Sequence, residues 1–295
     1  MDERSFDLTY GFVAVVIGVS QLGLAGLAVA LGYSRRSRAA TTSGTGGIDD
    51  ARSLLWWKRL AAARALSLVA TGQDRLTIMQ LLSDRHPAVQ SAATACLSRY
   101  ADAELLSRVI DGLSAASPAV RVYQLGVLRS CATLAAPMLL ERIRPDAPPH
   151  KLYAYIHAAA ELQDPECMGR VADLSTHPHP EVRVAVARVL RGTSGDGMHV
   201  KLLSLLRDPD WRVRAQAARG LSSADDARTV QEVARALMDQ NWWVRFRAGL
   251  ALATMGPVGR SALADARTHA DRYARDMALL ILGLSDASVA ELSAG

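Results

Sequence analysis

Tryptophan and arginine are the side chains of this sequence whose spacing points to chemistry, and that chemistry is molecular recognition. Trp211 and Trp242 each stand two residues before a valine, and Trp243 adds a third ring. The arginines interleaved with them are Arg212, Arg214, Arg245 and Arg247. Tryptophan and arginine are enriched among the residues that dominate binding energy at protein interfaces. The pattern predicts a Trp/Arg patch that binds a protein partner; the alternative is that the indoles only cover turns between repeats.

Motifs for catalysis and for cofactor binding are missing from the sequence. It has no HExxH, no GxSxG, no P-loop and no dinucleotide-type glycine fingerprint. His177 and His179 form a pair in a turn, but no third ligand stands nearby, so we expect no metal. Three cysteines, Cys96, Cys131 and Cys167, lie far apart, which favours reduced thiols over a disulfide framework. We therefore expect no enzymatic activity, no cofactor and no small-molecule ligand.

A motif with a period of about 31 residues must position the Trp/Arg patch. In the clearest units, an apolar start position is followed by apolar or small residues four, seven and eight places later, and the copies that begin at Lys58, Ala154 and Ala274 are weaker. The starts are Lys58, Val89, Val120, Ala154, Val182, Val213, Val244 and Ala274. This spacing lies on one face of an α-helix, and a second apolar stretch precedes each such helix. A fixed period of this length predicts an all-α solenoid of about eight stacked helix pairs over residues 53–295.

Three stretches carry a family resemblance: "HPHPEVRVAVARVL", "RDPDWRVRAQAARGL" and "DQNWWVRFRAGLALATMG". They resemble HEAT repeats, in the short form of phycobilisome-lyase-type repeats, and the resemblance spans roughly residues 53–284. It implies a hydrogen-bond ladder between units and a concave surface lined by the second helices. The ladder would join Asp84, Asp208 and Asp239 to arginines just after the starts, namely Arg59, Arg121, Arg183, Arg214, Arg245 and Arg275. Outside that register stand Arg188, Arg191, Arg219 and Arg247, which we expect to face outward; Arg188 and Arg219 join the predicted partner-binding residues.

The N-terminal part of the chain predicts a membrane anchor. Residues 11–33 carry no formal charge, and about 20 apolar residues suffice to cross a bilayer. Arginines follow this run at Arg35, Arg36 and Arg38, while acidic residues precede it. Basic residues stay on the cytoplasmic side, so residues 1–10 should be extracytoplasmic and the solenoid cytoplasmic. A cleaved signal peptide is the competing interpretation, disfavoured because the basic residues follow the apolar run. Residues 34–52 are polar and glycine-rich, which predicts a flexible tether.

Small residues recur at heptad spacing within this predicted transmembrane helix. The seam consists of Gly11, Ala14, Gly18, Gln21, Ala25, Ala28 and Gly32. Small residues let membrane helices approach closely, and Gln21 could hydrogen-bond across the contact. The pattern predicts packing against another membrane helix, although glycine and alanine are also common in membrane helices generally.

The leading functional hypothesis is a membrane-tethered scaffold for a protein partner, such as an envelope enzyme. An accessory protein of the phycobilin-lyase kind is the alternative that the repeat type implies, and it would need a pocket for a tetrapyrrole. Nucleic-acid binding is the third hypothesis. The formal net charge of +5 over 295 residues permits contact with an acidic partner but does not demand nucleic acid.

Overall fold

The computed structural model describes residues 49–98, 100–191, 196–224 and 226–294. These residues form sixteen α-helices and four short 3-10 helices. The predicted anchor and its packing seam lie outside the described residues, as does most of the predicted tether.

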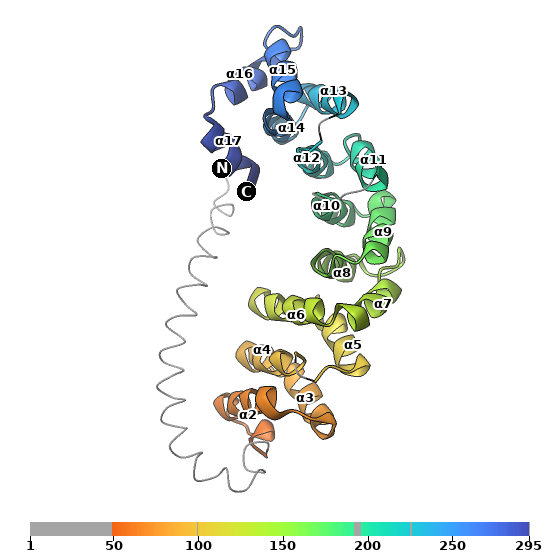
Figure 1. The fold of residues 1–295 in the computed structure, drawn as a ribbon, viewed down its shortest axis with the longest axis vertical. Coiled ribbons are helices and arrows are strands. Elements are labelled where there is room, and N and C mark those ends of the chain that lie inside the picture. The colour runs from red at the N-terminus through yellow and green to blue at the C-terminus, as the bar shows by residue number, and fades with distance from the viewer. Residues whose placement is uncertain (1–48, 99, 192–195, 225, 295) are drawn as a thin grey trace.

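Successive helices alternate between two layers of a curved stack (Figure 1). The concave layer holds α2 (Trp56–Val69), α4 (Pro87–Cys96), α6 (Pro118–Ser130), α8 (Pro149–Leu162), α10 (Pro180–Val189), α12 (Trp211–Gly220), α14 (Trp242–Thr254) and α16 (Arg272–Leu282). The convex layer holds α3 (Arg75–Leu82), α5 (Ala103–Gly112), α7 (Ala132–Arg142), α9 (Pro165–Asp173), α11 (Asp196–Leu205), α13 (Ala227–Arg235) and α15 (Gly256–Ala266). Each concave helix packs on the next one along, so the predicted α-solenoid is confirmed.

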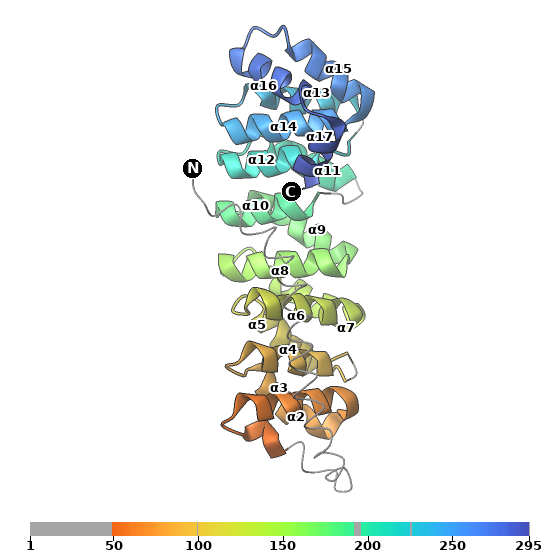
Figure 2. The same ribbon diagram turned by 90° about the vertical axis from the view of Figure 1, so that its left-hand side faces the viewer.

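The ends of the stack depart from the helix-pair rule. Among the described residues, the 3-10 helix η2 (Asp49–Arg52) is the element that precedes α2 of the first unit. The remaining 3-10 helices lie in turns, at η3 (Gly72–Asp74), η4 (Leu174–Thr176) and η5 (Ala236–Met238). After α16, the last helix α17 (Asp286–Ala294) turns back and lies on the concave side near α12 and α14 (Figures 1 and 2).

Local sequence signals explain where the helices begin. Side-chain oxygens cap the first turns of seven helices, from Asp102, Ser117, Asp164, Asp210, Asp226, Asn241 and Asp271. Proline occupies the first position of several others, where its missing N–H leaves no hydrogen bond unmade. Caps and prolines therefore fix where each helix begins, and together with the apolar positions they define the period of the repeat.

The core is the repeated apolar stripe. Start positions such as Val89, Val182 and Val244 are fully buried, and so are the residues four and eight places later in the same units. Two members of the stripe are exceptions, because Glu161 and Leu282 are exposed. Small residues also permit close approach: a Cβ added at Gly249 would lie 2.7 Å from Ile281 Cγ1 of the neighbouring α16.

None of the helices formed by the described residues is both long and apolar enough to cross a membrane alone. The pair α16 and α17 passes that test only when joined, and the two helices meet at a bend of 110°.

Candidate functional site

A ladder of arginine and aspartate side chains ties neighbouring units together. Arg183 on α10 donates from Nε and Nη2 to the carboxylate of Asp208, at 2.6 and 2.8 Å, and its Nη1 donates to two backbone carbonyls. Arg214 and Asp239 repeat this arrangement one unit later, and Arg59 with Asp84 makes the same contact in the first unit. These rungs confirm the predicted ladder at three of its six arginines, Arg59, Arg183 and Arg214.

Electrostatics stabilise each rung in its charged form. The hydrogen bond to Asp208 raises the pKa of Arg183 above its ordinary value, and Asp239 does the same for Arg214. Burial opposes ionisation of Asp84, yet hydrogen bonds from Arg59 and from the His86 amide together lower the pKa of that carboxyl. Each rung is therefore a charge-assisted contact between units.

The other arginines of the ladder register lack a carboxylate. Arg121 donates to the carbonyls of Leu113 and Ala116, and Arg275 to those of His269 and Ala270. Arg245 is only 8% exposed and donates from Nη1 to two backbone carbonyls. Its guanidinium carbon lies 4.6 Å from the centre of the Tyr273 ring, and its Nε has no hydrogen-bond partner.

Histidine replaces the ladder aspartate in two units. Asp208 and Asp239 each accept the amide hydrogen of the residue two places on, Asp210 and Asn241. His177 and His269 use Nδ1 for the same contact, with the amides of His179 and Asp271. This accounts for the His177/His179 pair as a turn structure; the described residues contain no group of three potential metal ligands.

The tryptophans of the predicted patch begin two neighbouring concave helices, α12 and α14. Trp211, Trp242 and Trp243 are 39%, 43% and 49% exposed. The Trp242 ring stacks on Phe246 at 4.8 Å and meets the Trp243 ring edge-on at 4.9 Å. Phe246 was missed by the sequence reasoning, although its place four residues after Trp242 puts both on one helix face. We call Trp211, Trp242, Trp243 and Phe246 the aromatic rim.

The arginines predicted to share this patch divide into three groups. Arg214 and Arg245 occupy ladder positions, and they donate hydrogen bonds to carboxylate or carbonyl oxygens in the turns between helices. Arg212 lies beside the aromatic rim and forms ion pairs with Asp210 and Glu181. Arg188, Arg219 and Arg247, together with Arg191, lie on or just after α10, α12 and α14; three of them donate to carbonyls of α17.

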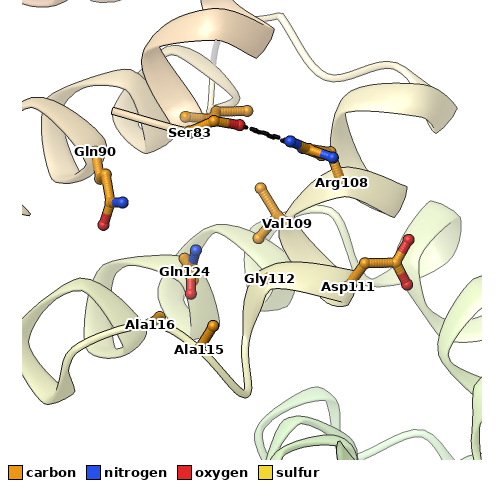
Figure 3. Close-up of a pocket in the computed structure, with 10 residues that line it drawn as sticks. Ser83, Gln90, Arg108, Val109, Asp111, Gly112, Ala115, Ala116 and Gln124 are labelled. Atoms are coloured by element: carbon orange, nitrogen blue, oxygen red, sulfur yellow. Dashed lines mark hydrogen bonds between the residues drawn. The ribbon is translucent and has the colours of Figure 1, made fainter. Parts of the chain in front are cut away.

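A polar cavity of about 240 Å³ lies between α4, α5 and α6. Gln124 occupies the position where other units place a small apolar core residue; it is 6% exposed and its Oε1 has no partner. The side chains of Gln90 and Gln124 border this space, the Asp111 carboxylate points away from it and accepts from Arg142, and Arg108 donates to Ser83 Oγ at 2.8 Å (Figure 3). The cavity is smaller than the roughly 300–1,000 Å³ of most ligand pockets, and its polar walls suit water.

Two of the three cysteines are buried thiols. Burial raises the pKa of Cys96 to about 11 and that of Cys167 to about 12. Both are therefore protonated at neutral pH, the form in which a thiol is a poor nucleophile. The three cysteines are free, with no bond between them.

Comparisons with known proteins point to the same helical-repeat architecture. Residues 200–283 match the family model of HEAT repeats, and the comparison with curated proteins finds no match. Among solved structures, human deoxyhypusine hydroxylase is 19% identical, with 85% of this chain and 97% of that chain covered and a TM-score of 0.33. The YibA protein of Escherichia coli is 16% identical, with 86% and 97% covered and a TM-score of 0.44. The CpcE and CpcF complex of phycocyanin lyase from Nostoc is 17% identical, with 82% and 92% covered and a TM-score of 0.33.

All three TM-scores are below 0.5, so no activity transfers from these structures to this chain. Residues 200–283 are thus similar to HEAT repeats, and the stacked helix pairs continue through the described residues as an all-α, HEAT-like solenoid.

Proposed function

We propose that this chain is a membrane-anchored cytoplasmic scaffold that binds a protein partner through the aromatic rim and the adjoining concave face. The observation that carries the proposal is the aromatic rim itself. Three tryptophans, each between 39% and 49% exposed, stand at the beginning of two packed helices, and Arg212 follows Trp211 in the chain. Partly exposed indoles held on a rigid framework lose little conformational entropy on binding, which is why such residues dominate interface energies.

The ladder supports this proposal by fixing the spacing of the rim. Arg183 and Asp208 join the unit of α10 to that of α12, and Arg214 and Asp239 join the unit of α12 to that of α14. The two helices that begin with Trp211 and Trp242 are therefore held at a constant separation. HEAT solenoids generally serve as protein-binding scaffolds, which agrees with a recognition surface built this way.

The membrane part of the proposal depends on the sequence of residues 11–38. The uncharged run of residues 11–33 and the three arginines that follow it favour a single-pass helix with the solenoid on the cytoplasmic side. Alkaline carbonate extraction of native membranes tests this directly: the chain should stay in the membrane pellet. Recovery in the soluble fraction, or a mature chain without residues 1–30, would contradict the anchor.

Crosslinking in native membranes followed by mass spectrometry tests the partner. The full chain should capture a defined protein, and the double variant Trp211→Ala/Trp242→Ala should lose it while the helical circular-dichroism signal is kept. Trp57→Ala is the matched control, because Trp57 is 51% exposed but lies on α2 at the other end of the stack. Equal capture by the double variant and the wild type would refute the role of the rim.

The phycobilin-lyase alternative gains no support from the cavity between α4, α5 and α6. Its 240 Å³ are below the usual range for a ligand pocket.

A further inference from the structure

Four arginines gather on the concave side where α10, α12 and α14 lie side by side. We call Arg188, Arg191, Arg219 and Arg247 the arginine quartet. Their effect on one another is visible at Arg219, whose pKa is lowered to about 10 by burial and by the positive charges of Arg191, Arg247 and Arg188. Burial and Arg191 likewise lower the pKa of Arg247. Among the described residues, no carboxylate lies within ion-pair distance of the quartet, although seventeen ion pairs form elsewhere.

The end of α17 instead covers three members of the quartet, while Arg188 donates to the Tyr153 hydroxyl at 3.5 Å. Arg247 donates to the carbonyl of Leu292 at 2.9 Å, and Arg191 donates to that of Ser293 at 3.2 Å. Arg219 donates to the carbonyls of Ser293 and Ala294, at 3.2 and 2.6 Å. The last carbonyls of a helix lack partners within the helix and carry the negative end of its dipole, about half an elementary charge. Figures 1 and 2 both place α17 over this part of the concave face.

This cover is a weak counterpart for four positive charges. Within residues 286–294, about half a negative charge faces three guanidinium groups, and two buried atoms of the contact, Arg219 Nε and Ser293 Oγ, have no hydrogen-bond partner. Val289 is the one buried side chain of α17 among its nine described residues. A segment with so little buried apolar surface opens at low free-energy cost. Carboxylates would make stronger, charge-assisted hydrogen bonds with the same arginines.

We propose that the arginine quartet is a docking site for an acidic segment of a protein partner, and that α17 covers this site until the segment displaces it. The proposal rests on the scaffold function and names the chemistry of the partner.

The shape of the site favours a peptide over other polyanions. Three arginines of the quartet now hold a piece of polypeptide by its carbonyl oxygens, so a peptide fits the space. Stacked helices lie about 8–10 Å apart, and every third residue of an extended chain advances by about 10 Å. Carboxylates at that spacing would meet arginines on successive helices. A flat bilayer meets the inner side of a curved stack poorly.

Fluorescence anisotropy with a labelled hexaglutamate peptide tests the site in the full chain, held in mild detergent at low salt. Val289→Asn should release α17 without adding charge, and Ala290→Pro should break the same helix by a second route. If α17 covers the site in at least nine molecules of ten, each variant should bind the peptide about tenfold more tightly than the wild type. Hydrogen exchange of residues 286–294 should become faster in both variants, which verifies the release.

Charge removal identifies the residues that bind. Arg188→Gln combined with Arg219→Gln, in the Val289→Asn background, should abolish hexaglutamate binding. Arg228→Gln is the matched control, because Arg228 is an exposed arginine on α13, in the convex layer. It should leave the affinity of the Val289→Asn protein unchanged.

Three results would overturn the proposal. The first is equal affinity of the wild type, Val289→Asn and Ala290→Pro proteins in spite of faster exchange at α17. The second is an equal loss of binding in Arg228→Gln, which would show a general effect of charge. The third is binding to vesicles of phosphatidylserine and phosphatidylcholine in equal parts but not to the peptide. Hexaglutamate binding does not depend on the native partner. A failure of the crosslinking test would therefore reject the scaffold function without deciding the result of the hexaglutamate measurement.

Discussion

The substitution Asp208→Ala should remove one rung of the ladder and destabilise the chain by about 3 kcal/mol. The Arg183 and Asp208 side chains are only 12% and 5% exposed, and two hydrogen bonds of 2.6 and 2.8 Å join them. Removing one partner of a buried ion pair costs about 3–5 kcal/mol, because the other charge stays buried without its counterpart. Arg183 would keep its two carbonyl acceptors, which places the expected cost at the lower end.

A double-mutant cycle with Arg183→Met separates the rung from other effects of each substitution. We would measure urea unfolding of the full chain in mild detergent by far-ultraviolet circular dichroism. The coupling energy between positions 183 and 208 should be about 2 kcal/mol, within the range for residues in direct contact. Arg207 and Glu232 supply the control: Arg207 is 71% exposed, so Arg207→Gln should cost less than about 0.5 kcal/mol.

A coupling energy below about 0.5 kcal/mol would refute the idea that the rung joins neighbouring units. The shape of the transition gives a second check. Because units of a solenoid contact only their neighbours, a weakened joint between α10 and α12 should broaden the transition or split it into two phases. A single sharp transition at unchanged urea concentration would count against the reasoning as well.

Two further outcomes follow from the same contacts. His269→Asp should raise the free energy of unfolding by about 1 kcal/mol, because a carboxylate in the ladder position would give the unpartnered Nε of Arg245 an acceptor. The measurement is Tm, which should rise. An unchanged Tm would show that position 269 does not lie where the aspartate of a ladder rung lies in other units. Burial and the charges of Arg188 and Arg121 lower the pKa of His157 from 6.5 to about 4, so protonation favours the unfolded chain. The resulting stability is complete above pH 6.5 and should fall by up to about 3 kcal/mol towards pH 4. His157→Gln should remove that part of the pH dependence of unfolding, and identical slopes for both proteins would exclude the effect.

Much of the fold could be predicted from the sequence because each unit is specified locally. The apolar stripe, the N-terminal caps and the prolines act within about ten residues, and they recur often enough to reveal the period. The ladder could be predicted for the same reason. Asp208 and Asp239 follow their arginines at a constant interval of 25 residues, so the contact between units is written into the spacing.

The candidate site was only partly predictable. From the sequence, Arg214 and Arg245 belong to the Trp/Arg patch as well as to the ladder. In the structure, both donate hydrogen bonds to Asp239, in the turn between α13 and α14. The position of an arginine in a helical sequence does not reveal whether its side chain bonds to a neighbouring turn or faces solvent. The choice depends on which acceptor the neighbouring unit presents. Phe246 could have been added to the aromatic rim from its spacing to Trp242 alone.

The sequence by itself determined the solenoid, its period and the residues that hold one unit to the next, because those interactions are local or repeat at a fixed interval. The tertiary structure alone decided that α17 returns to the concave face and meets the arginine quartet. Arg191 and Ser293 are 102 residues apart, and the contact has no counterpart in other units. It depends on the accumulated curvature of the stack and on the turn after α16, neither of which leaves a periodic mark in the sequence.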